Sequence, residues 1–256
     1  MSARLGPFAH RTYWLSMTGS TNDVASHLAE VGAIEGTTVV AEAQTAGRGR
    51  YGRDWFSPAG AGLYVSVVLK PANVDALARR LNPTALLTLA SGVAIVEGIK
   101  SATGLPAQIK WPNDIVMGRR KLAGILAEAA AQGGFLQFII LGFGVNLNSA
   151  AYPADLASRA TSIEAETGRS PDRALLLAEI LASIAERYAD LQVGRFDAIL
   201  SAWRRLAPSA QSAPVEWNSP DGVLRGRADG IDDQGALLIR VDDRVERVIA
   251  GEVRWI

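Results

Sequence analysis

The stretch Gly47-Arg48-Gly49-Arg50-Tyr51-Gly52-Arg53 places three glycines and three arginines within seven residues. Glycine allows a backbone to fold closely around an anion, and fixed positive charges on the same loop would help to hold that anion. Farther along the chain, Lys110-Trp111-Pro112-Asn113-Asp114 sets a cation and a carboxylate at the two ends of a stiff segment. Taken alone, the first motif is as compatible with a flexible basic loop as with an anion-binding loop. Together, the two motifs indicate a site for a small acid and a nucleotide phosphate.

The glycine-arginine loop also matches the Gly-x-Gly-x-x-Gly pattern of dinucleotide-binding folds, and it follows a strand-like run at 37–43. That fold requires a helix to begin directly after the glycines, so that the helix N-terminus faces the pyrophosphate. Residues 54–62 instead have the composition of a loop. The sequence also contains no Gly-x-x-x-x-Gly-Lys-Ser/Thr string. The pattern therefore favours neither a Rossmann domain nor a P-loop.

Composition restricts the possible functions. The 256 residues are 48% hydrophobic and carry a formal net charge of zero, so nothing global indicates binding to DNA or to an anionic membrane. The absence of cysteine excludes disulfides, thiolate metal sites and cysteine nucleophiles, and two histidines are too few for a typical zinc site or Ser-His-Asp triad. We find no apolar run long enough to span a bilayer and no signal-peptide core. We therefore expect a cytoplasmic protein with neither a DNA nor a membrane partner.

Helix signals occur at several points. Ser20 is expected to cap a helix that ends at Gly32, and Asn82-Pro83 is expected to start a longer one that reaches about Lys100. Two more helices are expected at 171–191 and 196–206. The residues predicted to face the core are Val24, Leu28 and Val31 in the first helix and Leu86, Leu89, Val93 and Val96 in the second.

Strand-like runs lie between these helices, at 37–43, 63–69, 107–111, 115–117, 122–129 and 135–145, with a hairpin turn at 117–120. After Pro208 the sequence pattern changes, because turns rich in Asp and Gly separate short runs of alternating apolar and polar residues that are typical of strands. We predict an α+β fold with a large domain at 1–207 and a small β domain at 208–256. The small domain has too few residues to form an independent core readily, so we expect it to pack against the large domain.

Five segments occur in the order and spacing typical of the biotin–protein ligase family. They are Ser20-Thr21-Asn22, Gln44-Thr45-Ala46-Gly47-Arg48-Gly49-Arg50, Lys110-Trp111-Pro112-Asn113-Asp114, Lys121-Leu122-Ala123-Gly124-Ile125-Leu126-Ala127-Glu128 and Gly142-Phe143-Gly144-Val145-Asn146-Leu147-Asn148. Each could arise by chance, but the ordered set is specific, and the chain resembles this family over nearly its whole length. The resemblance implies a class II synthetase-like catalytic domain with a mixed sheet and flanking helices, followed by a small SH3-like β-barrel. Because the first motif begins at Ser20, we expect the monofunctional group that lacks a helix-turn-helix domain.

The resemblance also implies a two-step reaction that uses biotin and ATP with Mg²⁺. The biotin carboxylate attacks the α-phosphate of ATP to give biotinyl-5′-AMP and pyrophosphate. A lysine amine on the biotin carboxyl carrier protein, or on the biotin domain of a carboxylase, then attacks this mixed anhydride and releases AMP. The sequence does not distinguish a monomer from a homodimer.

Three residues are expected to carry the catalysis. A carboxylate and a triphosphate repel each other, so the site must supply cations where they meet. Lys121 is the first candidate, since only four of the 26 basic residues are lysines and this one follows two arginines. Arg50 would act from a loop that orders over the intermediate and excludes water. Asp114 could help the acceptor amine lose its proton.

The remaining expected ligand contacts come from neutral groups, glycines and further cations. Neutral hydrogen-bonding groups suit the ureido ring of biotin, and glycines allow strands to approach a ligand closely. The predicted binding residues are Ser20, Thr21, Asn22, Gln44, Gly47, Arg48, Gly49, Arg50, Trp55, Lys110, Asn113, Lys121, Gly124, Gly142, Gly144 and Asn146. Trp55 and Trp111 offer flat faces for adenine, and either could equally pack in the core. Tyr51 stands where the family often has a further arginine, which lowers the charge of the loop.

Asp114 and Asn146 are the predicted metal ligands. Asp114 could orient Mg²⁺, ATP or the incoming lysine, and Asn146 resembles a family position that contacts the ATP phosphates through the metal. Both residue types are also common in ordinary turns. The C-terminal strands contain no predicted site residue, although they could steady the site or receive the carrier domain.

Two other functions stay open at this point. A lipoate–protein ligase or an octanoyl transferase would share the fold, although the Gly-Arg-Gly-Arg and Lys-Trp-Pro-Asn-Asp strings favour the biotin branch. A nucleic-acid-binding module that uses the arginine-glycine loop is the second alternative. The zero net charge of the chain argues against nucleic-acid binding, and a salt-dependent affinity for DNA would reveal such a function.

Overall fold

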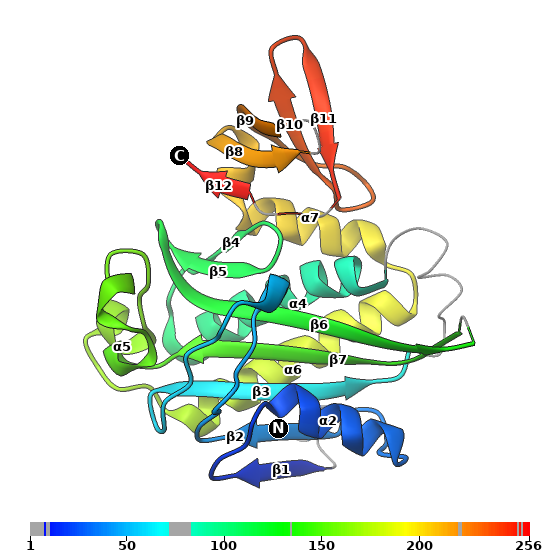
Figure 1. The fold of residues 1–256 in the computed structure, drawn as a ribbon, viewed down its shortest axis with the longest axis vertical. Helices are drawn as coiled ribbons and strands as arrows, with labels where there is room; N and C mark the ends of the chain where they lie inside the picture. Colours follow the sequence, from blue (N-terminus) through cyan, green and yellow to red (C-terminus); the bar gives the residue numbers. More distant parts are fainter. Residues whose placement is uncertain are drawn as a thin grey trace.

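The computed structural model describes residues 8, 11–71, 83–133, 135–219, 222–249, 251 and 253–256. Its larger part is a seven-stranded mixed sheet (Figure 1). The strands are β1 (Thr12–Leu15), β2 (Thr38–Ala41), β3 (Gly62–Leu69), β4 (Gln108–Lys110), β5 (Asp114–Met117), β6 (Arg120–Gln132) and β7 (Phe135–Asn146). Their order is β1-β2-β3-β7-β6-β5-β4; β1 pairs with β2 in parallel and every other neighbouring pair is antiparallel. The predicted α+β fold with a mixed sheet is confirmed.

Helices cover both faces of this sheet. The α-helices are α2 (Thr21–Glu30), α4 (Pro83–Thr103), α5 (Ile163–Thr167), α6 (Arg173–Gln192) and α7 (Phe196–Leu206). Because side chains alternate along a strand, neighbouring residues of β3 point to opposite faces. Val67 belongs to the large core with α4 and α6, and Val68 belongs to the small core under α2. The molecule is thus layered, with α2 on one face and α4 and α6 on the other.

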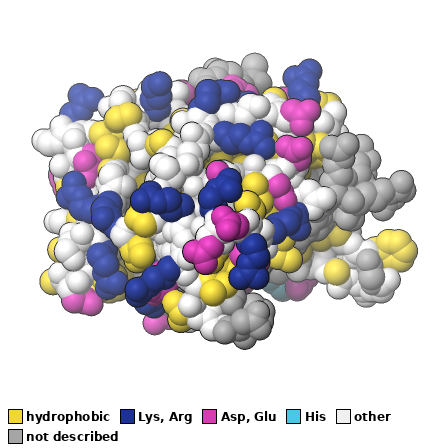
Figure 2. Space-filling model, turned by 90° about the horizontal axis from the view of Figure 1, so that it is seen from above, with side chains coloured by type: hydrophobic (Ala, Val, Ile, Leu, Met, Phe, Trp, Pro, Cys, Tyr) yellow, Lys and Arg dark blue, Asp and Glu magenta, His cyan; other side chains and the backbone are white. Residues whose placement is uncertain are grey.

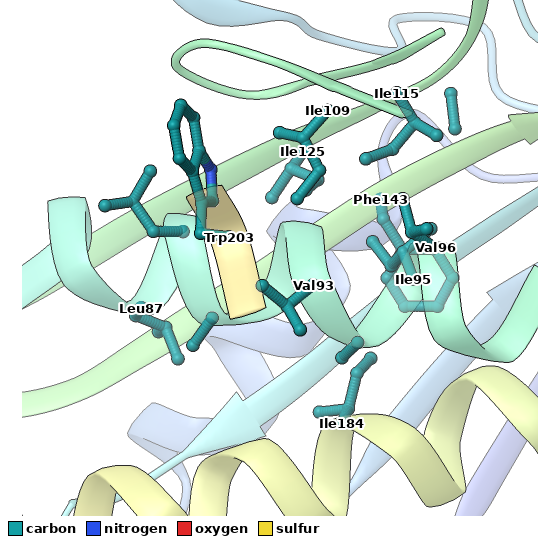
Figure 3. Close-up of a cluster of buried hydrophobic side chains, with 14 of the residues drawn as sticks. Leu87, Val93, Ile95, Val96, Ile109, Ile115, Ile125, Phe143, Ile184 and Trp203 are labelled. Carbon is teal, nitrogen blue, oxygen red and sulfur yellow. The ribbon is translucent and has the colours of Figure 1, made fainter. Parts of the chain in front are cut away.

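The large core lies between the sheet and α4. Figure 3 shows Val93 and Val96 of α4 beside Ile125 and Phe143 of the central strands, with Trp203 of α7 at one end. All four core residues predicted for this helix are buried. The predicted cap Asn82 lies outside the described residues.

The same helix corrects one expectation about membranes. Among the described residues, Thr84–Thr103 is long and apolar enough to cross a bilayer, although the sequence had indicated no such run. Two thirds of this segment, 67%, is buried inside the protein. A mostly buried apolar helix is what a protein core requires, so its composition is explained by its contacts with the sheet and α6.

The orientation predicted for α2 is confirmed only in part, since Val24 and Leu28 pack against the small core at the edge of the buried face and Val31 does not. The buried face of α2 consists of Thr21, Asn22, Ala25 and Ala29. Val24 and Leu28 are only partly buried, and Val31 is 67% exposed. The two alanines allow close packing on the sheet, and the two polar residues have partners beneath the helix. Ser20 is the N-cap by position, but its side chain makes no capping hydrogen bond.

A second sheet follows α7. It consists of β8 (Pro214–Ser219), β9 (Gly222–Ile231), β10 (Leu237–Val241), β11 (Arg244–Val248) and β12 (Val253–Trp255), in the order β11-β10-β9-β8-β12. The predicted small C-terminal β structure is confirmed. Among the described residues no ladder joins β11 to β12, so the hydrogen bonding is that of an open sheet.

The two sheets share one apolar core, since Val215 and Leu237 belong to the same cluster as α4 and Trp203. Trp111 joins them directly, because its indole N–H donates to the carbonyl of Gly235 at 3.2 Å. This tryptophan is buried in the core, as one of its two expected roles required. Figure 2 views the molecule from the side of the second sheet and shows basic and acidic side chains interspersed over that face.

A close helix–helix contact leads to a first prediction. A methyl group on Gly98 of α4 would lie 2.5 Å from Cα of Ile180 in α6, closer than the two backbones allow. Gly98→Ala should therefore lower the free energy of unfolding by about 1–3 kcal/mol, despite alanine's better helix propensity. Gly92→Ala in the same helix is the matched control, because its methyl group would be 3.5 Å from the Ile109 side chain. The control should gain about 0.5–1 kcal/mol in denaturant unfolding. Equal stability of the two variants would contradict the packing argument.

Candidate active site

A cavity of about 200 Å³ lies where the start of α2, the glycine-arginine loop and strands β5 to β7 meet. Fifteen of the residues predicted from the sequence line it: Ser20, Thr21, Asn22, Gln44, Arg48, Gly49, Arg50, Trp55, Lys110, Asn113, Asp114, Lys121, Gly124, Gly142 and Gly144. Gly47 and Asn146 are not part of its lining. Five sequence motifs far apart in the chain therefore form one site.

Strand pairing explains part of this convergence. Asp114 on β5 is opposite Gly124 on β6, and Gly124 is opposite Gly144 on β7. Successive antiparallel pairings thus set these three positions side by side across the sheet.

Neutral polar groups form one wall. Gln44 Oε1 accepts hydrogen bonds from the backbone N–H of Thr21 at 2.8 Å and from its hydroxyl at 3.1 Å. Ser66 Oγ, which is fully buried on β3, lies 2.8 Å from Thr21 Oγ1 and also contacts Asn22 Oδ1. The first turn of α2 is thereby fixed to the sheet, which explains why its polar face is turned inward.

This wall continues into a charged group. Asn22 Nδ2 donates to Glu128 Oε2, and that same oxygen lies 3.7 Å from Arg48. Arg48 also forms a bidentate ion pair with Asp23, at 2.8 and 2.5 Å. The Arg48 hydrogen bond keeps the pKa of Asp23 below its ordinary value. Arg48 therefore lies at the cavity with its charge already balanced by carboxylates.

Arg50 connects the loop to the Trp-Pro-Asn turn. Its Nη1 is 3.4 Å from Asn113 Oδ1, a long hydrogen bond, and its Nη2 donates to the hydroxyl of Tyr51 at 2.9 Å. Asn113 is itself fixed, since its Nδ2 donates to the carbonyl of Ile125 at 2.8 Å. The guanidinium of Arg50 thus lies between the loop and the turn that follows β4.

Tyr51 connects the same loop to the second sheet. It adopts a left-handed backbone conformation with φ of 59°, which is unfavourable for a side chain of this size. Its hydroxyl accepts a hydrogen bond from the backbone N–H of Gly251 at 2.8 Å. Gly251 and Val253 also line the cavity, so the C-terminal part of the chain completes its wall.

This contact leads to a second prediction. Tyr51→Phe removes the acceptor for the Gly251 amide, and one such hydrogen bond is worth about 1 kcal/mol. Hydrogen exchange at the Gly251 amide should then become about fivefold faster, as mass spectrometry of the C-terminal peptide would show. Tyr13→Phe makes the same chemical change on the edge strand β1 and should leave this exchange unchanged. An unaltered rate in Tyr51→Phe would show that the contact does not restrain the chain.

Lys121 and Asp114 form an ion pair inside the cavity, with Nζ 2.6 Å from Oδ1. The ammonium also lies 5.2 Å from the centre of the Trp55 ring, within the range of a cation–π contact. An ammonium has three N–H donors, so Lys121 can keep Asp114 and still donate to an anionic ligand.

The cavity glycines accommodate side chains of the protein itself. A methyl group on Gly144 would lie 2.4 Å from Trp55 Nε1, and one on Gly142 would lie 2.2 Å from Asn22 Oδ1. A methyl group on Gly47 would similarly lie 2.5 Å from the carbonyl oxygen of Trp55. These glycines therefore shape the wall that a ligand would meet. Trp55 Nε1 is buried without a hydrogen-bond partner among the described residues.

Asn146, the other predicted metal ligand, lies outside the lining of the cavity. Its side chain is buried and its Nδ2 donates to the carbonyl of Thr161 at 2.9 Å, which fixes the chain after β7 to a neighbouring loop. Within the described residues no group of three or more His, Cys, Asp or Glu side chains could hold a metal ion. Asp114 remains as one carboxylate at the cavity, already paired with Lys121.

Sequence reasoning missed several residues at this site. Asp23 directly follows the Ser-Thr-Asn motif, and Glu128 closes the motif that begins at Lys121, so each stood beside an identified signal. For Gly251 and Val253 no local signal existed, because tertiary folding alone brings them to a loop 200 residues away.

Comparisons with known proteins find similarity over nearly the whole chain. The model of the biotin/lipoate A/B protein ligase family matches residues 14–146, and that of the biotin protein ligase C-terminal domain matches residues 214–254. The biotin--[acetyl-CoA-carboxylase] ligase of Paracoccus denitrificans is 36% identical over 245 residues, which are 93% of this chain and 98% of that protein. The bifunctional ligase/repressor BirA of Bacillus subtilis is 36% identical over 91% of this chain and 70% of its own length. Biotin protein ligase from Aquifex aeolicus, solved in complex with biotin and ATP, has a TM-score of 0.82 at 28% identity, with 96% of this chain and 100% of that chain covered.

Proposed function

Because this chain belongs to the biotin/lipoate A/B protein ligase family, we propose that the cavity at the start of α2 is the site where biotin and ATP react. The protein is an ATP-dependent ligase that activates biotin as biotinyl-5′-AMP. It then transfers the biotinyl group to a lysine of the biotin carboxyl carrier protein of a carboxylase. The Paracoccus denitrificans relative and the Aquifex aeolicus structure reported above carry the name of biotin, which favours biotin over lipoate or octanoate.

One observation supports this site above all others: the cavity has a neutral hydrogen-bonding wall and a cationic wall. Thr21 and Gln44 belong to the first and suit the polar ring of biotin. Lys121 and Arg50 belong to the second and suit a carboxylate that meets a phosphate.

In the first step, a carboxylate oxygen of biotin forms a bond to the α-phosphorus, and the bond to pyrophosphate breaks. Negative charge accumulates on the phosphoryl oxygens in the transition state. Lys121 Nζ, fixed by Asp114 on one side and by the Trp55 ring on another, would donate to these oxygens. A cation that is already positioned requires little reorganisation, which is the physical source of the rate gain.

In the second step, the lysine amine of the carrier attacks the acyl carbon, and the bond to AMP breaks. An amine with a reference pKa near 10.4 is mostly protonated at neutral pH, so it must lose a proton before it attacks. Asp114 is the carboxylate in the cavity that we propose to accept this proton. Its contact with Lys121 would hold its position in both steps.

No group of three or more His, Cys, Asp or Glu side chains that could hold a metal ion is present among the described residues. Magnesium commonly binds through substrate phosphates with one or two carboxylates. We propose that Mg²⁺ arrives with ATP as part of the substrate. Its predicted protein ligands are Asp114, which lines the cavity, and Asn146, which lies outside the lining.

Several wider expectations remain proposals. The division at 207 and 208 describes the two sheets, although one core joins them. A cytoplasmic location, the absence of DNA and membrane partners and a monomeric or homodimeric state are proposed on the basis of the sequence alone.

A substrate comparison tests the proposed function. Pyrophosphate release should require ATP and biotin, and lipoate or octanoate at the same concentration should give little product. Equal release with lipoate would assign the chain to the lipoate branch. Release that none of the three acids stimulates would contradict acid activation at this cavity.

A further inference from the structure

The ion pair between Arg48 and Asp23 lies at the edge of the cavity. Arg48 lines the cavity, whereas Asp23, on the outer side of the first turn of α2, does not. Both nitrogens at the end of the guanidinium are engaged by Asp23, at 2.8 and 2.5 Å, in the bidentate geometry that suits an arginine and a carboxylate. The charge expected to attract a substrate anion is therefore directed at the protein's own carboxylate.

The two carboxylates near Arg48 differ in their surroundings. Glu128 accepts a hydrogen bond from the buried Asn22 side chain, which ties it to the polar wall beneath α2. Asp23 is 60% exposed, and Arg48 is its only partner given by the described structure. Water can therefore hydrate Asp23 readily once Arg48 leaves it, whereas Glu128 would stay in place.

We propose that Asp23 competes with the incoming substrate anion for Arg48, so that binding exchanges the guanidinium from Asp23 to the ligand. This inference rests on the proposed function, because it requires that the cavity binds an anion. The anionic group is a carboxylate of the acid substrate or a phosphate of the nucleotide, and both offer the paired oxygens that a guanidinium recognises. Asp23 is then a positioning residue that holds Arg48 at the rim in the free protein and limits affinity.

The exchange predicts a gain in affinity when the competitor loses its charge. Asp23→Asn keeps the size of the side chain and removes the negative charge. Exposed ion pairs are weak, so the expected effect is about a two- to fivefold lower Kd for the ligand that uses Arg48. If Asp23 instead orients Arg48 for the ligand, the same variant would bind more weakly.

Calorimetry with the full chain distinguishes these outcomes. Biotin alone and ATP alone are titrated separately, so that the tightened ligand identifies whether the carboxylate or the phosphates meet Arg48. Glu30→Gln removes an equal charge from the last turn of the same helix and serves as the control. The affinity gain should occur in Asp23→Asn only, and it should vanish when the substitution is made together with Arg48→Ala.

Three results would overturn the proposal. They are unchanged or weaker binding of both ligands by Asp23→Asn, an equal gain in Glu30→Gln, and a gain that persists without Arg48. A wild-type chain that binds neither biotin nor ATP would overturn the proposed function as well. A wild-type chain that binds them without tightening in Asp23→Asn would overturn this inference alone.

Discussion

Replacing Lys121 with alanine is expected to slow formation of biotinyl-5′-AMP by about 10²–10³-fold, the loss typical when one preorganised group that stabilises transition-state charge is removed. The expectation follows from position, because Nζ is fixed by Asp114 at 2.6 Å and faces the cavity beside Trp55. The measurement is pyrophosphate release at saturating biotin and ATP.

Two controls accompany this variant. Lys100→Ala removes an exposed lysine from the last turn of α4 and should leave the rate unchanged. Denaturant unfolding of Lys121→Ala shows whether the isolated Asp114 carboxylate destabilises the fold. Near wild-type pyrophosphate release from a folded Lys121→Ala protein would remove Lys121 from the mechanism.

Arg50→Gly is expected to release the intermediate. Arg50 joins the loop to Asn113 and to Tyr51, and Tyr51 in turn holds Gly251. Hydrogen bonds that involve a charged group are worth about 1.5–3 kcal/mol, so their loss should speed escape of biotinyl-5′-AMP by roughly tenfold or more. The freed anhydride would then biotinylate lysines of bystander proteins, while part of the first step survives.

A second substitution at this position separates the side chain from the backbone. Arg50→Ala removes the same guanidinium without the extra flexibility of glycine, and this variant should also release biotinyl-5′-AMP into solution. The readout is biotin on an added protein that contains no carrier domain, measured beside the rate of pyrophosphate release. A variant that is simply inactive, or one that stays specific for the carrier, would contradict a role of Arg50 in retaining the intermediate.

Much of the fold could be predicted from the chain itself, because its determinants are local. The long apolar helix α4 and the hairpin from β5 to β6 follow from periodicity and from a glycine turn. The orientation of α2 could be predicted only in part in this way. Its apolar stripe suggested one face, but the partners of Thr21 and Asn22 lie on β3 and β6, and they turn the polar face inward.

The candidate site was likewise predictable only where local sequence decides the structure. The motifs supplied the residue types, and pairing across β5, β6 and β7 brings Asp114, Gly124 and Gly144 into line. What each side chain contacts depends on tertiary partners that no motif records. Arg48 carries the charge that was expected, yet Asp23 balances it. Asn146 was expected at a metal, yet its amide holds a backbone carbonyl.

The central claim is that this cavity activates biotin and that the chain transfers it to one lysine of a carrier domain. Intact mass of a purified carrier domain, after incubation with the protein, biotin and ATP, tests this most directly. We expect a mass gain of one biotinyl group per carrier, which disappears without ATP or when the acceptor lysine is replaced with arginine. A carrier of unchanged mass, or one modified equally well with lipoate in place of biotin, would contradict it.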